Sequence, residues 1–141
     1  MKVRCIRLLG PSGKPQTRSN WLTVGKIYDV LEVVQDQGRW LFRVMGDEPN
    51  GVALFALDQF EITNSKMPDS WIPKWGKNGF FELSPEAWQK AGFWERYYDK
   101  DSEAIRMFED ERRKIIYVDS EMNMSEPTSQ PKHDEDQRAK N

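Results

Sequence analysis

The sequence of 141 residues contains one cysteine and one histidine. The lone Cys5 has no partner for an intramolecular disulfide, and within a strand-like segment we interpret it as a small buried side chain. Structural zinc sites need clusters of Cys and His, which this composition excludes. His133 lies in a polar terminal segment, so a Ser–His or Cys–His nucleophile has no base in the folded body. We therefore expect no enzyme activity, no metal site and no cofactor.

Long apolar runs are also lacking. The N-terminal segment MKVRCIRLLG carries charges and has no apolar region of the length that a signal peptide needs. No stretch approaches the roughly 20 apolar residues of a membrane span. The sequence therefore favours a soluble cytoplasmic protein that makes no contact with a membrane.

A basic excess is lacking as well. The formal net charge is −2, and residues 119–141 alone contain six acidic and three basic residues. The rest of the chain is close to neutral, whereas nucleic-acid-binding domains usually carry a basic excess. This balance argues against nucleic acid as the partner, although a local basic patch is compatible with a neutral total.

Two short patterns resemble ligand-binding loops without meeting their requirements. GPSGK at 10–14 lacks the spacing between glycines, and the Ser or Thr after the lysine, that a phosphate-binding loop has. DKDSEA at 99–104 lacks the ligand number and the glycine of a calcium loop. We interpret the first as a turn, and Asp99, Asp101 or Ser102 in the second as a helix cap.

Large aromatic residues are abundant. They make up 12% of the chain and include six tryptophans, and each can bury about 150–250 Å². Residues 1–118 therefore have enough apolar surface for one compact domain. Residues 119–141 are almost entirely polar, which predicts a disordered tail.

The first half of the chain has the pattern of short strands. We predict strands over 2–9, 21–34, 39–45, 52–57 and 60–62, separated by Gly-, Pro- and Ser-rich turns. Residues 39–45 alternate apolar and basic side chains, which suits either a nucleic-acid surface or a strand with one buried and one solvated face. This spacing predicts a small antiparallel barrel or sheet.

The second half is predicted to be mostly helical. Residues 63–79, with two prolines and two glycines, are expected to connect the halves, and 80–83 to add a further strand. Ser84 as N-cap and Pro85 at the first position predict a short helix that Gly92 ends. A final amphipathic helix is predicted from about 99–102 to 118. Strands followed by helices indicate an α+β fold.

One resemblance covers about residues 1–62. NWLTVGKIYDV at 20–30 and GRWLFRVMGDEPNGVALFALDQFEI at 38–62 resemble the strands of SH3-like small barrels. The resemblance implies a small antiparallel SH3-like β-barrel in 1–62. The pattern of the later residues adds a connecting segment in 63–79 and a mostly helical part in 80–118 packed on the barrel. It implies little about the ligand.

A second resemblance covers residues 60–116. The Pro-x-x-Trp motifs at Pro68–Trp71 and Pro85–Trp88, and Gly-Phe-Trp-Glu at 92–95, are similar to small bacterial immunity proteins of polymorphic and contact-dependent toxin systems. The resemblance implies a protein that binds and neutralises a cognate toxin or effector by covering its active or substrate site. Arg96 stands where the family frequently has an acid, so this surface is expected to be less acidic.

Partner-binding residues follow from this hypothesis, because Trp, Tyr and Arg dominate binding energy at interfaces and acids speed association with a basic toxin. The predicted anchors are Trp75, Trp94, Tyr97 and Tyr98, and the predicted acidic contacts are Asp99, Asp101, Glu103 and Asp110. The alternative is that Phe93, Trp94 and Tyr97 pack the last helix onto the barrel. The alternative function is an SH3-like nucleic-acid-binding or regulatory module.

Overall fold

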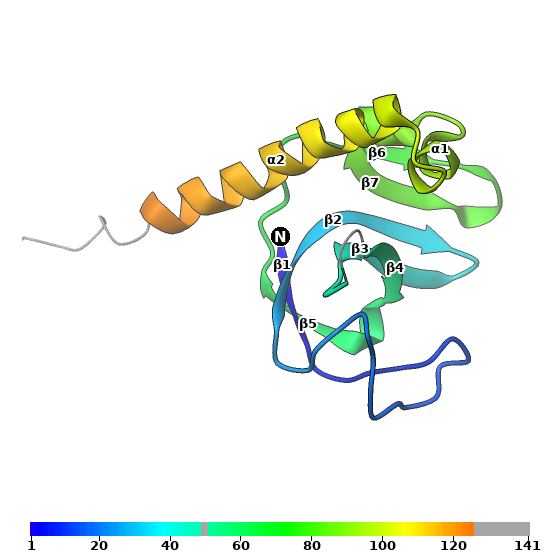
Figure 1. The fold of residues 1–141 in the computed structure, drawn as a ribbon, viewed down its shortest axis with the longest axis vertical. Helices are drawn as coiled ribbons and strands as arrows, with labels where there is room; N and C mark the ends of the chain where they lie inside the picture. The colour runs from blue at the N-terminus through cyan, green and yellow to red at the C-terminus, as the bar shows by residue number, and fades with distance from the viewer. Residues whose placement is uncertain (49–50, 126–141) are drawn as a thin grey trace, which may run out of the picture.

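The computed structural model describes residues 1–48 and 51–125, with side chains described as far as Ile116. Within these residues, antiparallel strands and two helices form an α+β fold, as the sequence predicts (Figure 1). The strands are β1 (Lys2–Cys5), β2 (Ile27–Asp36), β3 (Arg39–Met45), β4 (Val52–Ala56), β5 (Phe60–Asn64), β6 (Trp71–Trp75) and β7 (Phe81–Pro85). The helices are α1 (Phe93–Tyr98) and α2 (Ser102–Ser125), with 3₁₀ turns η1 (Leu57–Gln59), η2 (Lys77–Gly79) and η3 (Glu86–Gln89).

Strand β2 organises the sheet because it pairs with three other strands. Its first residues pair with β1, which pairs with β5. Its later residues lie between β3 and β7, and these pair with β4 and β6 respectively. The main path β4-β3-β2-β1-β5 therefore branches at β2 toward the β7–β6 hairpin. The sheet is not closed into a barrel, so the expected SH3-like barrel is not confirmed.

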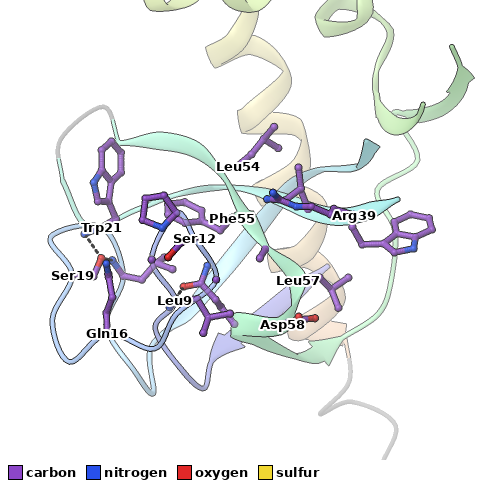
Figure 2. Close-up of a pocket in the computed structure, with 18 of the residues that line it drawn as sticks. Leu9, Ser12, Gln16, Ser19, Trp21, Arg39, Leu54, Phe55, Leu57 and Asp58 are labelled. Carbon is purple, nitrogen blue, oxygen red and sulfur yellow. Dashed lines mark hydrogen bonds between the residues drawn. The ribbon is translucent and has the colours of Figure 1, made fainter. Parts of the chain in front are cut away.

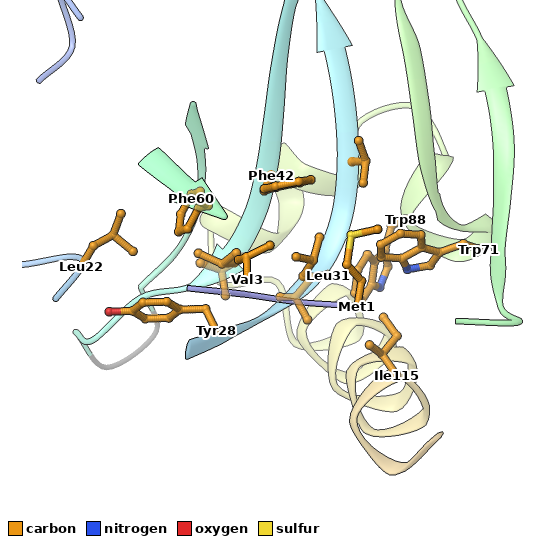
Figure 3. Packing of buried hydrophobic residues seen from close by; sticks show 14 of the residues in the cluster. Met1, Val3, Leu22, Tyr28, Leu31, Phe42, Phe60, Trp71, Trp88 and Ile115 are labelled. Atoms are coloured by element: carbon orange, nitrogen blue, oxygen red, sulfur yellow. The ribbon is translucent and has the colours of Figure 1, made fainter. Parts of the chain in front are cut away.

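Both faces of β2 are covered, which explains its continuous apolar run. Val30, Leu31, Val33 and Val34 are all buried, with a register shift between Val30 and Glu32. A strand with one face in solvent would alternate instead. Figure 3 shows Tyr28, Phe42 and Phe60 in one part of the core, and Leu31, Trp88 and Ile115 in another.

The second part of the core is an aromatic cluster beneath α2. The Trp88 ring stacks on Phe108 at 5.1 Å and lies 6.5 Å from Phe93. Phe93, Trp88 and Phe108 are almost completely buried. Phe93 therefore packs the helices inward, as the packing alternative for this segment requires.

Several predicted boundaries are wrong, and Pro73 explains one of them. The structure places β6 inside residues 63–79, the segment predicted to be a connection. The prediction missed this strand because a proline argues against a strand unless that strand is at an edge of the sheet. Within residues 1–48 and 51–125, β6 pairs only with β7 and is such an edge. The strands predicted over 2–9 and 21–34 are shorter, and the residues between Cys5 and Ile27 form one long loop.

The predicted helix start at Ser84 is also wrong. Ser84 and Pro85 end β7, and the helical turn η3 begins only at Glu86. The Ser84 hydroxyl finds no hydrogen-bond partner among the described residues. Gly92, with φ +78°, stands at the start of α1, a helix that the sequence did not predict. α2 continues to Ser125, into the segment predicted to be a tail, while residues 126–141 of that tail lie outside the described residues.

Candidate binding groove

A groove with a volume of about 1050 Å³ lies between the long β1–β2 loop and strands β3 and β4 (Figure 2). Leu9, Gln16 and Trp21 line it from the loop, and Trp40 and Phe55 from the strands. Trp40 and Phe55 lie on the same face of the sheet as Phe42, because Phe55 is the cross-strand partner of Phe42 and Trp40 is two residues before it. The groove is therefore an open continuation of the first part of the core.

Backbone hydrogen bonds hold the tip of the loop in one conformation. Gly10 N donates to the Lys14 carbonyl at 2.8 Å, and Gln16 N donates to the Leu8 carbonyl at 2.9 Å. Leu9 N donates to Oε1 of the buried Gln59 at 2.9 Å, which joins the loop to η1. A loop fixed in this way loses little conformational entropy when it binds a ligand.

Asp47, in the β3–β4 turn, fixes the other end of the loop. Its carboxylate accepts hydrogen bonds from Thr23 at 2.7 Å, Lys26 at 2.6 Å and Tyr28 at 3.0 Å. Its backbone N also donates to the Trp21 carbonyl at 2.8 Å. Desolvation acts to raise the pKa of Asp47, but these donors outweigh it and hold the pKa below its usual value. The carboxylate therefore stays ionised and holds Thr23, Lys26 and Tyr28, while the backbone hydrogen bond keeps Trp21 at the groove.

Three aromatic rings continue from the groove across the sheet, and we name Trp40, Phe81 and Trp75 the aromatic shelf. Gln35 of β2 pairs with both Trp40 and Phe81, and Phe81 pairs with Trp75, so all three side chains point to one face. The ring centroids are 6.2 Å apart for Trp40 and Phe81, and 5.4 Å apart for Trp75 and Phe81. Trp75 is 72% exposed and Trp40 44% exposed.

A buried polar cluster lies under α1, on the other face of the sheet. Arg43 Nε donates to Glu32 Oε1 at 2.6 Å, and Arg43 Nη1 donates to the Tyr98 hydroxyl at 2.9 Å. The Tyr98 hydroxyl donates to the Val52 carbonyl at 2.8 Å, and the Arg43 guanidinium lies 3.7 Å from the centre of the Trp94 ring. These contacts attach α1 to β3 and β4.

Two carboxyl groups of this region have unusual proton affinities. Burial raises the pKa of Glu32, against the opposing effect of Arg43. Burial, followed by the nearby charge of Glu32, raises the pKa of Glu82 to about 7, against Lys74 and Arg43. No nucleophile lies in hydrogen-bond contact with either carboxyl among the described residues. The cluster therefore attaches α1 to the sheet. Its neighbour Glu82 keeps a proton up to about pH 7.

The predicted aromatic anchors fall into two separate places. Trp94 and Tyr97 pack on Phe108, with ring centroids 6.0 and 4.7 Å away, and Tyr98 is 49% exposed although its hydroxyl is bound in the polar cluster. Trp75 lies apart from them, at the end of β6 on the shelf. The structure thus gathers three of the four aromatics around α1.

The predicted acidic contacts lie on the α1–α2 corner and along α2. The Asp101 carboxylate accepts from Ala104 N at 3.0 Å, which caps α2, and it also pairs with Arg96 at 3.0 Å. The backbone N–H of Ala104 and then Arg96 lower the pKa of Asp101. Arg96 is also 3.7 Å from Glu103, and Asp110 is 3.7 Å from Arg113. Asp99 is exposed and makes no side-chain ion pair within the described part of the chain.

Arg39 and Arg43, at the ends of the basic–aromatic alternation, have opposite environments. Arg39 is exposed at the groove, whereas Arg43 is buried in its ion pair with Glu32. The alternation is therefore not one continuous basic surface. Sequence reasoning did not select the groove residues Trp21 and Phe55, because no local pattern brings the loop to β4. It considered Trp40 only as part of the basic–aromatic alternation.

Comparisons with family models, with curated proteins and with solved structures find no match to this chain. Among the described residues, no helix is long and apolar enough to cross a membrane. In the same part of the chain, no three Asp, Glu, Cys or His side chains gather into a possible metal site.

Proposed function

We propose that this protein is a non-enzymatic binding module that holds an extended segment of a partner protein in the groove. The observation that carries the proposal is the prearranged groove, with a hydrogen-bonded loop on one side and the exposed Trp40 on the other. Exposed tryptophans at the edge of a preformed concave site are typical binding anchors. The Trp21 ring, 6.2 Å from Phe55, adds a second anchor at the opposite end.

Kinship with SH3-like barrels belongs to the same proposal. The strand order β4-β3-β2-β1-β5, the long β1–β2 loop and the η1 turn before β5 support it. SH3-like domains hold extended peptides in aromatic-lined grooves. In this chain the β6–β7 hairpin and the helices would then be additions to that unit.

The specific form that we retain is an immunity protein that neutralises a cognate toxin, for which the resemblance of residues 60–116 is the support. Its test is co-expression with the toxin-like gene that neighbours its own gene, with survival as the measurement. Cells that survive only when this protein is present support the immunity role. A gene neighbourhood without a toxin-like reading frame removes the immunity role and leaves the binding module.

The binding function is tested by selecting displayed random peptides against the immobilised full-length protein and measuring the affinity of the enriched peptides by fluorescence anisotropy. We expect Trp40→Ala to weaken binding about tenfold or more, since anchor residues contribute about 2 kcal/mol. Met67→Ala is the matched control, because Met67 is exposed but lies outside the groove. Failure to enrich any peptide, or equal effects of the two substitutions, would overturn the proposal.

A further inference from the structure

We propose that the groove and the aromatic shelf select an acidic, extended segment of the partner protein. This inference rests on the proposed binding function and adds the chemistry of the ligand. Three features carry it: the charge of the loop, the position of the shelf beside the groove, and the carboxylates on the strand side of the groove.

The charged side chains of the loop that forms one wall of the groove are all basic. Residues 6–26 contain Arg7, Lys14, Arg18 and Lys26 and no Asp or Glu, and Lys26 is already paired with Asp47. Arg18 lines the groove, and Lys14 is near the tip of the same loop. Both are exposed, and within the described residues neither side chain makes a hydrogen bond or an ion pair. These two positive charges are therefore available to a ligand.

The shelf extends the groove because Trp40 belongs to both. Figure 1 shows that the β2–β3 and β6–β7 hairpins end on the same side of the molecule, where the shelf lies. Arg39, next to Trp40, and Lys77, in the turn after Trp75, add exposed positive charges that have no ion pair among the described residues. A segment that crosses the groove and the shelf would meet apolar rings flanked by cations.

The partner would use the face of the shelf and not its edge. Pro73, in the middle of the edge strand β6, has no N–H for a further strand. Side chains of the segment, and not an added β-ladder, would therefore supply most of its contacts.

A protein segment fits these charges better than single-stranded nucleic acid. Asp58 lines the groove from the sheet side, and Asp36 is the cross-strand partner of Arg39. A nucleic acid carries a charge at every phosphate and would meet these carboxylates, whereas a peptide can place its acids toward the loop alone. The shelf rings also contact each other at interplanar angles of 52° and 71°, which leaves no parallel stack of faces for successive bases.

The experiment uses fluorescent peptide pools of equal length in which apolar residues alternate with Asp/Glu, with Asn/Gln or with Lys/Arg, together with oligo(dT). We expect the full-length protein to bind the acidic pool about tenfold more tightly than the neutral pool at low salt. Lys14→Glu with Arg18→Glu should abolish that preference, because it replaces two cations that face an acidic ligand by carboxylates that repel it. Arg106→Glu with Lys90→Glu, an equal charge change at two exposed positions outside the groove, is the control.

The outcomes separate the inference from the function. Equal affinity for acidic and neutral pools, sensitive to Trp40→Ala, would overturn the acidic selection and leave the binding module intact. No binding of any peptide pool, together with no enriched peptide, would overturn both. Tighter binding of oligo(dT) than of the acidic pool, weakened by the double loop variant and steeply by salt, would make nucleic acid the ligand and overturn both as well.

Discussion

Replacing Glu82 by glutamine should remove a pH dependence of the folding stability. Glu82 is 7% exposed in β7, and its pKa is raised to about 7 from its usual 4.5, first by burial and then by the charge of Glu32. The folded protein therefore keeps a proton on Glu82 up to about pH 7, whereas the unfolded chain loses it near pH 4.5. Between these values the folded state binds more protons than the unfolded state.

The sign and the size follow from that difference. The contribution of Glu82 to the free energy of unfolding should be highest below pH 4.5, decrease as the pH rises, and level off above about pH 7. At 1.36 kcal/mol for each pKa unit, the loss is about 3 kcal/mol. Glu32 has a pKa raised by burial and adds a decrease of the same sign, while Asp47 and Asp101, with lowered pKa values, act only at more acidic pH. The difference between wild type and Glu82→Gln isolates the contribution of Glu82.

Urea unfolding followed by tryptophan fluorescence at a series of pH values measures this difference. We expect Glu82→Gln to be more stable than wild type above pH 7, and the gap to close toward acidic pH. Glu86→Gln is the matched control, because Glu86 is exposed at the start of η3. Parallel stability curves for wild type and Glu82→Gln would refute the reasoning, as would a wild type that becomes more stable between pH 5 and 7.

Three further changes test the packing of the helices. Arg43→Met should destabilise the protein by about 3–5 kcal/mol in urea unfolding, because it leaves the Glu32 carboxylate buried without its partner; a double variant with Glu32→Met should regain stability, and failure to regain it would contradict this account. Asp101→Ala should lower the free energy of unfolding by about 1 kcal/mol, because α2 loses its N-terminal cap. Asp110→Ala is the control and should lower it much less in the same assay, because Asp110 makes only a surface ion pair. Phe108→Ala should cost about 3–5 kcal/mol and lower the thermal midpoint, since Phe108 is fully buried under Trp88; a loss below 1 kcal/mol would show that this cluster is not packed as described.

The elements that local pattern specifies were predicted well. β3 and β4 lie within a residue of their expected positions, because alternation and Gly-rich turns are local properties. β6 was missed because Pro73 is tolerated there only by virtue of an edge position, which depends on the whole sheet. Helix α1 was missed because six residues are too few for a periodic pattern to be recognised.

The groove depends on contacts between distant segments, and this explains why the sequence did not reveal it. Leu9 is joined to Gln59, and Trp21 to Asp47, across separations that no motif records. The basic character of residues 1–28 was visible in the sequence. Its relevance to binding follows only from the structure, which places this loop along one wall of the groove.

The corner between α1 and α2 is acidic and the loop side of the groove is basic, so the two surfaces would attract partner segments of opposite charge. At the corner, Arg96 pairs with Asp101 and lies near Glu103. Such exposed pairs are worth only about 0–1 kcal/mol, so a basic toxin could displace Arg96 at small cost. Charge on the corner therefore does not decide the binding surface. Asp99→Asn should weaken the binding of a partner that uses the corner. Trp40→Ala should weaken the binding of a partner that uses the groove. Titrating wild type and both variants with the same partner therefore distinguishes the two surfaces.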